Sequence, residues 1–113
     1  MFTTEQKKEA IRKFKERKPL AGVYAVRCPQ DGRTWVGSTR NVDAVKNAVF
    51  FSLRLGSHRE RSLQEAWNAY GEAAFEFQAL ETLESDVEPM LVSDLLKEAK
   101  QRWMWELSAT GLL

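Results

Sequence analysis

The spacing of apolar positions along the chain changes several times, and each change marks a predicted element. From residue 22 to residue 36, two runs alternate in hydrophobicity, which indicates strands because successive strand side chains point to opposite faces. Between the runs, residues 29–32 read Pro-Gln-Asp-Gly, a composition typical of a tight turn. The pattern predicts a hairpin whose first strand carries Val23, Ala25 and Arg27 on one face and Tyr24, Val26 and Cys28 on the other.

Apolar residues recur at helical spacing, three or four positions apart, later in the chain. The segments with this spacing are residues 42–55, 57–70 and 93–107. We expect Asn41 to cap the first of these helices. Ser57 and Glu60 have the spacing of a capping box at the second helix, and Gly71 is expected to end it.

Two further segments complete the predicted order of elements. Residues 75–79 alternate again and predict a third strand, and residues 84–92 form an acidic loop. Near the N-terminus, residues 3–18 predict a charged helix that Pro19 ends. The order α-β-β-α-α-β-α favours an α+β fold with a small antiparallel sheet flanked by helices.

Length and composition place the chain among ordinary globular domains. With 113 residues, we interpret residues 1–113 as a single domain, with a basic helical extension over 1–19 and a core over 20–107. No apolar run approaches the ~20 residues of a membrane helix, so no membrane partner is expected. One cysteine and the absence of a secretory signal pattern fit a cytoplasmic location.

Charge is distributed unevenly between the two halves of the sequence. Residues 1–61 contain 14 lysines and arginines against 6 acidic residues, whereas residues 62–113 contain 3 against 10. A basic half can provide contacts to phosphates. The alternative is that both halves pack together and the charges mix over the surface.

Several short motifs of the chain resemble those of the GIY-YIG nuclease family. Gly22-Val23-Tyr24 is similar to the first tripeptide of that family, and Trp35-Val36-Gly37 to the second. Gly56-Ser-His58, the Leu63-Gln64-x-x-Trp67-x-x-Tyr70-Gly71 segment and Phe75-x-Phe77 also resemble members of the family. The resemblance covers residues 20–107 and implies a three-stranded antiparallel sheet flanked by helices.

The resemblance also implies phosphodiester hydrolysis with Mg²⁺ or Mn²⁺, but several of the family's functional positions carry other residues here. Tyr24 matches the first catalytic tyrosine, whereas Trp35 replaces the second, and an indole N–H only donates hydrogen bonds. The family's helical arginine corresponds to Val45, and the position of its frequent histidine to Val49. Lys100 stands where the family places a metal-binding glutamate. Lysine does not bind Mg²⁺, so no metal ligand is assigned and whether the chain is an enzyme stays open.

His58 is the only histidine and has two interpretations. It resembles a Ser-His pair of small bacterial members of the family and is a candidate catalytic base. Arg54, Arg59 and Arg61 flank it, and we expect their charge to lower the pKa of the imidazole. The alternative is a histidine that organises its loop.

Three hypotheses for function follow. The leading one is a GIY-YIG-like domain with a degenerate metal site that binds nucleic acid, DNA rather than RNA. The residues expected to contact nucleic acid are Trp35, Gly37, Ser38, Arg40, Arg54 and Arg59. The second is an active variant nuclease using Tyr24 and His58 with Mg²⁺ or Mn²⁺. The third is a non-catalytic interaction module whose cleft is made apolar by Val45 and Val49.

Overall fold

The predicted hairpin is present and forms the centre of the sheet. The computed structural model describes residues 20–84 and 86–112, so the predicted basic helix of residues 3–18 lies outside the described part. Strands β1 (Gly22–Cys28) and β2 (Arg33–Thr39) pair antiparallel, with Tyr24 opposite Gly37. The turn closes through the N–H of Gly32, which donates to the carbonyl of Cys28 at 2.8 Å. Gly32 has φ of +74°, a backbone conformation that glycine adopts without steric penalty.

The sheet has four strands, which corrects the predicted three. Strand β3 (Glu76–Thr82) pairs antiparallel with β1, and strand β4 (Thr110–Gly111) pairs parallel with β2, giving the order β3-β1-β2-β4. A two-residue strand that includes a glycine has no alternation to detect, so the sequence pattern could not reveal β4. Its effect is to cover part of the edge of β2, where the N–H of Leu112 donates to the carbonyl of Val36 at 2.8 Å.

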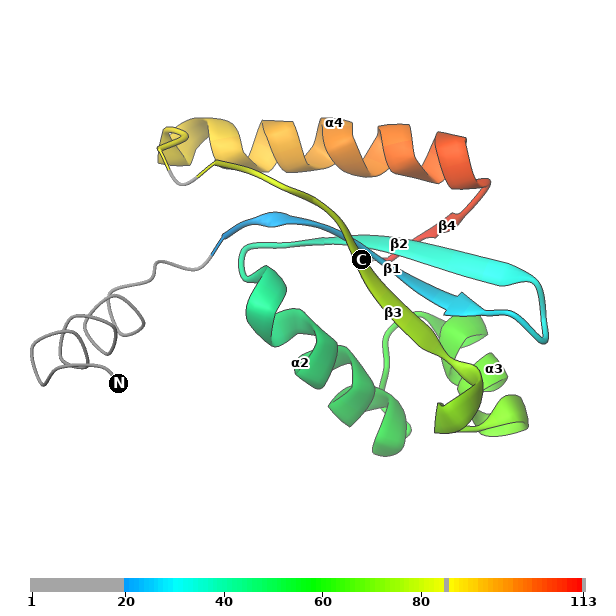
Figure 1. Ribbon diagram of the computed structural model, residues 1–113. Helices are drawn as coiled ribbons and strands as arrows, with labels where there is room; N and C mark the ends of the chain where they lie inside the picture. Colours follow the sequence, from blue (N-terminus) through cyan, green and yellow to red (C-terminus); the bar gives the residue numbers. More distant parts are fainter. Residues whose placement is uncertain (1–19, 85, 113) are drawn as a thin grey trace, which may run out of the picture.

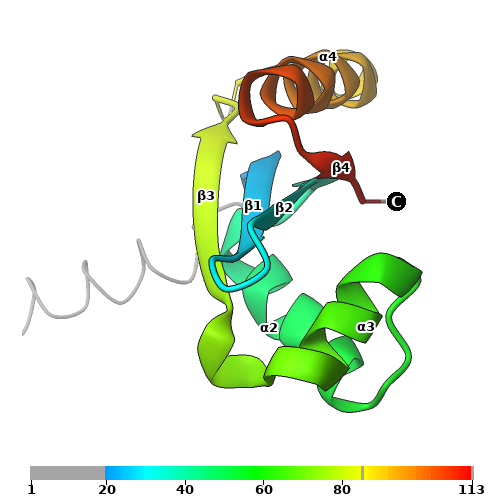
Figure 2. The same cartoon turned by 90° about the vertical axis from the view of Figure 1, so that its right-hand side faces the viewer.

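Helices cover both faces of the sheet (Figures 1 and 2). Helices α2 (Val42–Arg54) and α3 (Arg61–Tyr70) lie on one face, and α4 (Pro89–Leu107) lies on the other. A short 3₁₀ helix, η1 (Glu72–Ala74), connects α3 to β3. Within the part of the chain that the structure describes, no helix combines the length and apolarity needed to cross a membrane.

The alternation predicted for β1 divides the core into two layers. Tyr24, Val26 and Cys28 belong to the cluster on the side of α2 and α3. Val23 and Ala25 belong to the cluster that packs under α4. Every residue of β1 except Arg27 is buried, since this strand lies inside the sheet with helices on both faces.

The local signals at the helix ends are partly confirmed. Asn41 caps α2, with its side-chain oxygen accepting from the N–H of Ala44 at 3.2 Å. The predicted capping box at α3 is wrong, because the Ser57 hydroxyl donates to the carbonyl of Ser52 and Glu60 is the residue before the helix. The last helix begins at Pro89, earlier than predicted, since proline is favourable in the first helical turn.

Candidate nucleic-acid interface

Tyr24 is held inside the core on the α2 side of the sheet. Its side chain is only 5% exposed and stacks on Phe77, with ring centroids 5.4 Å apart. On the neighbouring strand lies Gly37, where an added Cβ would be 2.5 Å from the Tyr24 hydroxyl oxygen. Burial raises the pKa of Tyr24, which disfavours the phenolate that a general base requires.

Trp35 is a structural residue, which corrects the prediction that it contacts nucleic acid. Its side chain is fully buried, so it presents no ring face to a base. The indole Nε1–H donates to the hydroxyl of Ser62 at 3.0 Å, and this hydroxyl donates to the carboxylate of Glu60 at 2.8 Å. The two bonds attach β2 to the start of α3, so Trp35 serves packing here.

Val45 and Val49 also point into the protein. Val49 is buried in the cluster that contains Tyr24 and Trp35, and Val45 is partly buried against the same cluster. Neither valine provides an exposed apolar surface over the sheet, which was the feature expected for an interaction module.

His58 organises the loop between α2 and α3. Its Nδ1 accepts a hydrogen bond from the N–H of Glu60 at 3.0 Å, which assigns the proton of the neutral ring to Nε2. The N–H of His58 donates to the side chain of Gln64, which in turn donates to the carbonyl of Leu53. The pKa of His58 is lowered, as expected, but burial lowers it and the flanking arginines do not contribute. The geometry therefore favours the loop-organising interpretation over the catalytic base.

We expect folding stability to fall as His58 becomes protonated. Because the pKa of His58 is lowered in the folded state, the unfolded chain binds the proton more tightly than the folded chain. The stabilisation is therefore present above the unfolded pKa of about 6.5, and it is lost as pH falls through the folded pKa. The measurement is urea unfolding at pH 7.5 and 5.5 for the wild type and for His58→Asn, whose side chain cannot titrate. A loss of stability that is equal in both proteins would contradict the prediction. NMR titration of the single imidazole should independently give a pKa below 6.5.

The predicted basic residues do not gather at one site. Arg54 ends α2 and pairs with Glu72, and that carboxylate raises the pKa of the guanidinium. Arg59 is exposed in the loop that follows. Arg40 lies before the start of α2, and because a helix rises 1.5 Å per residue, the 13 residues of α2 separate it from Arg54 by about 20 Å.

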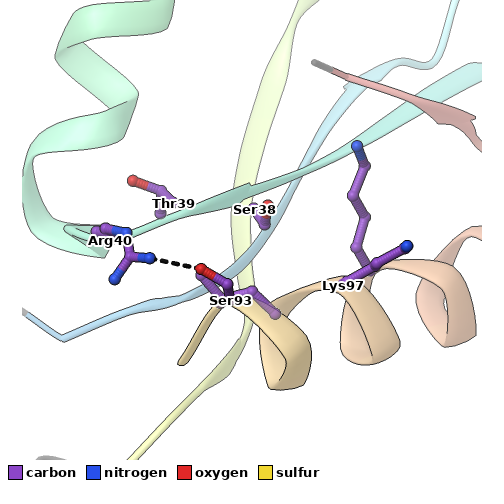
Figure 3. Close-up of a pocket in the computed structure, with 7 residues that line it drawn as sticks. Ser38, Thr39, Arg40, Ser93 and Lys97 are labelled. Atoms are coloured by element: carbon purple, nitrogen blue, oxygen red, sulfur yellow. Dashed lines mark hydrogen bonds between the residues drawn. The ribbon is translucent and has the colours of Figure 1, made fainter. Parts of the chain in front are cut away.

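Ser38 and Arg40 instead join the α4 side of the sheet, opposite the face that holds Tyr24. Ser38 is paired with Val23, whose side chain packs under α4. The end of β2 and the first turns of α4 border an open pocket of about 370 Å³ (Figure 3). We call it the β2–α4 pocket; it is lined by Ser38, Thr39, Arg40, Ser93, Leu96, Lys97 and Lys100.

Hydrogen bonds fix two of the cations in the β2–α4 pocket. The Nη2 of Arg40 donates to the hydroxyl of Ser93 at 2.7 Å, which joins the end of β2 to α4 (Figure 3). The ammonium of Lys100 donates to the carbonyl of Leu112, just beyond β4. Ser93 and Lys97 were not among the site residues predicted from the sequence. The signal that could have found them is the spacing of Ser93, Lys97 and Lys100, which places three polar residues on one face of a helix.

The residues at the family's metal position do not fit a divalent cation. Lys100, which the sequence resemblance places at that position, is a cation, and the lining of the β2–α4 pocket contains no carboxylate. Across residues 20–84 and 86–112, no three histidine, cysteine, aspartate or glutamate side chains are close enough together to hold a metal ion.

The order of the motifs and the layered sheet define a GIY-YIG-like fold. Two solved structures of the catalytic domain of I-TevI, a GIY-YIG homing endonuclease, are similar to this chain. A glutamate-to-alanine mutant of that intron endonuclease domain matches with a TM-score of 0.68 and 25% identity, over 83% of this chain and 92% of its own. The second structure matches with a TM-score of 0.68 and 24% identity, over 82% and 98%. No family model matches the sequence, and no curated protein matches it either.

Proposed function

We propose that this chain is a nucleic-acid-binding domain that uses a GIY-YIG-like fold without metal-dependent phosphodiester hydrolysis. The observation that carries the proposal is the β2–α4 pocket, where Lys100 replaces the family's metal-binding glutamate beside Lys97 and Arg40. A cationic pocket without carboxylates attracts phosphate and repels Mg²⁺. Because the similar solved structures are homing endonuclease domains, DNA is the favoured ligand over RNA.

The groups that hydrolysis requires are not assembled around this pocket. Activation of water requires a base, which the buried Tyr24 with its raised pKa does not readily provide. His58 lies in the loop after α2, and its Nδ1 is occupied by the N–H of Glu60. These positions support binding over the alternative of an active variant that uses Tyr24 and His58 with Mg²⁺ or Mn²⁺.

The test combines gel retardation with a cleavage assay on labelled single-stranded and duplex DNA, each with EDTA, Mg²⁺ or Mn²⁺. We expect retarded but uncut DNA in all three conditions, and the same result for Tyr24→Phe. Each phosphate contact contributes about −0.7 (single strand) to −0.9 (duplex) to the slope of log affinity against log salt, so contacts from the three pocket cations predict a contribution of about −2 to −3.

Two results would contradict the proposal. Absence of salt-sensitive retardation would remove the binding function. Metal-dependent cleavage that Tyr24→Phe abolishes would show that the site has been rebuilt around other residues and that the variant nuclease is correct.

A further inference from the structure

The β2–α4 pocket gathers three of the described cations at one place. Residues 20–84 and 86–112 contain 10 lysines and arginines against 13 aspartates and glutamates, so acidic partners are abundant. Arg33, Arg54 and Arg102 each form an ion pair with a carboxylate. Arg40, Lys97 and Lys100 instead line one pocket whose lining contains no carboxylate, although Glu84 lines an adjoining groove beside Arg40.

The donors in the β2–α4 pocket are only partly used within the protein. The guanidinium of Arg40 has five N–H groups, and among residues 20–84 and 86–112 its hydrogen bond is to Ser93. Lys100 uses one of its three N–H groups on the carbonyl of Leu112. The hydroxyl of Ser93 accepts from Arg40 and keeps its own proton to donate. The Thr39 hydroxyl donates to the carbonyl of Asn41 and accepts from its N–H, so it is less available to bond a ligand.

The charge in the pocket matches a particular kind of phosphate. An internal phosphodiester carries one negative charge, whereas a phosphate monoester carries about −1.5 to −2 at pH 7 and has three terminal oxygens. The volume of about 370 Å³ is near the lower end of ligand pockets, which suits the end of one strand better than a duplex. The bonds to Ser93 and Leu112 hold Arg40 and Lys100 in place, which reduces the entropy lost on binding.

We propose that the β2–α4 pocket binds the terminal phosphate monoester of a nucleic-acid strand through Arg40, Lys97 and Lys100. This inference rests on the proposed nucleic-acid binding and adds a preference for phosphorylated ends. The buried Leu96 forms an apolar part of the pocket wall. The hydroxyls of Ser38 and Ser93 donate to the remaining phosphate oxygens.

The experiment compares single-stranded oligonucleotides of one sequence carrying a 5′-phosphate, a 3′-phosphate or no terminal phosphate, by fluorescence anisotropy on the full chain. One of the phosphorylated forms is expected to bind about tenfold (about 1.4 kcal/mol) more tightly than the unphosphorylated one, since a terminal phosphate adds charge-assisted hydrogen bonds. The double variant Lys97→Gln/Lys100→Gln should lose this preference. Lys46→Gln, which changes a lysine on α2, is the matched control and should retain it. Circular dichroism confirms that each variant is folded.

The outcomes separate this inference from the proposed function. Equal affinity for all three oligonucleotides overturns the inference and leaves nucleic-acid binding intact. If no oligonucleotide binds, the proposed function fails, and the pocket is then tested alone by NMR with inorganic phosphate. Chemical-shift changes confined to the pocket residues support a phosphate site, and the absence of such changes overturns that site. If a nucleoside monophosphate binds as tightly as the phosphorylated strand, the pocket still binds a phosphate monoester, but the proposal that this phosphate comes from a strand end is overturned.

Discussion

Trp35→Ala should lower the free energy of unfolding by about 3–5 kcal/mol, the range for truncation of a large aromatic side chain in a core. Trp35 is fully buried between the hairpin and α3, and the truncation also leaves the Ser62 hydroxyl without its donor. Because small domains have only about 5–15 kcal/mol of stability, the variant should unfold at much lower urea concentration. Urea unfolding followed by circular dichroism measures the difference.

Trp105→Ala is the control for this measurement. Trp105 is 87% exposed on α4, so the same truncation should change stability by no more than about 0.5 kcal/mol. Trp35→Phe keeps one aromatic ring in the core but loses the second ring of the indole and its N–H, so its loss of stability should fall between those of the other two variants. If Trp35 acted as a platform for bases, Trp35→Phe would weaken DNA binding at unchanged stability; we expect the reverse, reduced stability with binding retained.

The elements with strong periodicity could be predicted from the sequence. The division of β1 into Tyr24, Val26 and Cys28 on one face and Val23 and Ala25 on the other is confirmed, since a pleated strand leaves no other arrangement. The cap at Asn41 is also confirmed, because it depends only on residues that are neighbours in the sequence. Strand β4 could not be predicted because its two residues pair through backbone atoms with a distant strand, and no side-chain pattern records that contact.

The candidate site was less predictable because its members are distant in sequence. Ser38 and Arg40 were identified beside the second motif, but their neighbours Ser93 and Lys97 come from a helix that begins about fifty residues later. Arg54, His58 and Arg59 are closer in sequence to Arg40, yet the 13 residues of α2 separate Arg54 from Arg40 by about 20 Å. The face toward which Trp35 points follows from the strand alternation, whereas its burial depends on α3 packing over it, which the sequence does not specify.

Gly37→Ala should lower stability by about 1–3 kcal/mol, the range for overpacking a core, because of one contact across the hairpin. The new Cβ would lie 2.5 Å from the hydroxyl oxygen and 2.6 Å from the ring carbon Cζ of Tyr24. The ring cannot move away freely, since it is buried and stacked on Phe77. The first motif's tyrosine and the second motif's glycine are therefore coupled by packing, independently of any role in chemistry.

A double-mutant cycle with Tyr24→Leu tests this coupling directly. Leucine lacks the ring atoms that the new Cβ would meet, so Gly37→Ala should be nearly neutral in that background and the coupling energy should be about 1–3 kcal/mol. Gly22→Ala in β1 is the control, because its Cβ would be 2.2 Å from the backbone oxygen of Glu81 on β3, a contact that no change at Tyr24 relieves. It should destabilise both backgrounds equally. A Gly37→Ala effect that is the same with tyrosine and leucine at position 24 would show that the hairpin relaxes around the added methyl group, and that glycine is required there for another reason.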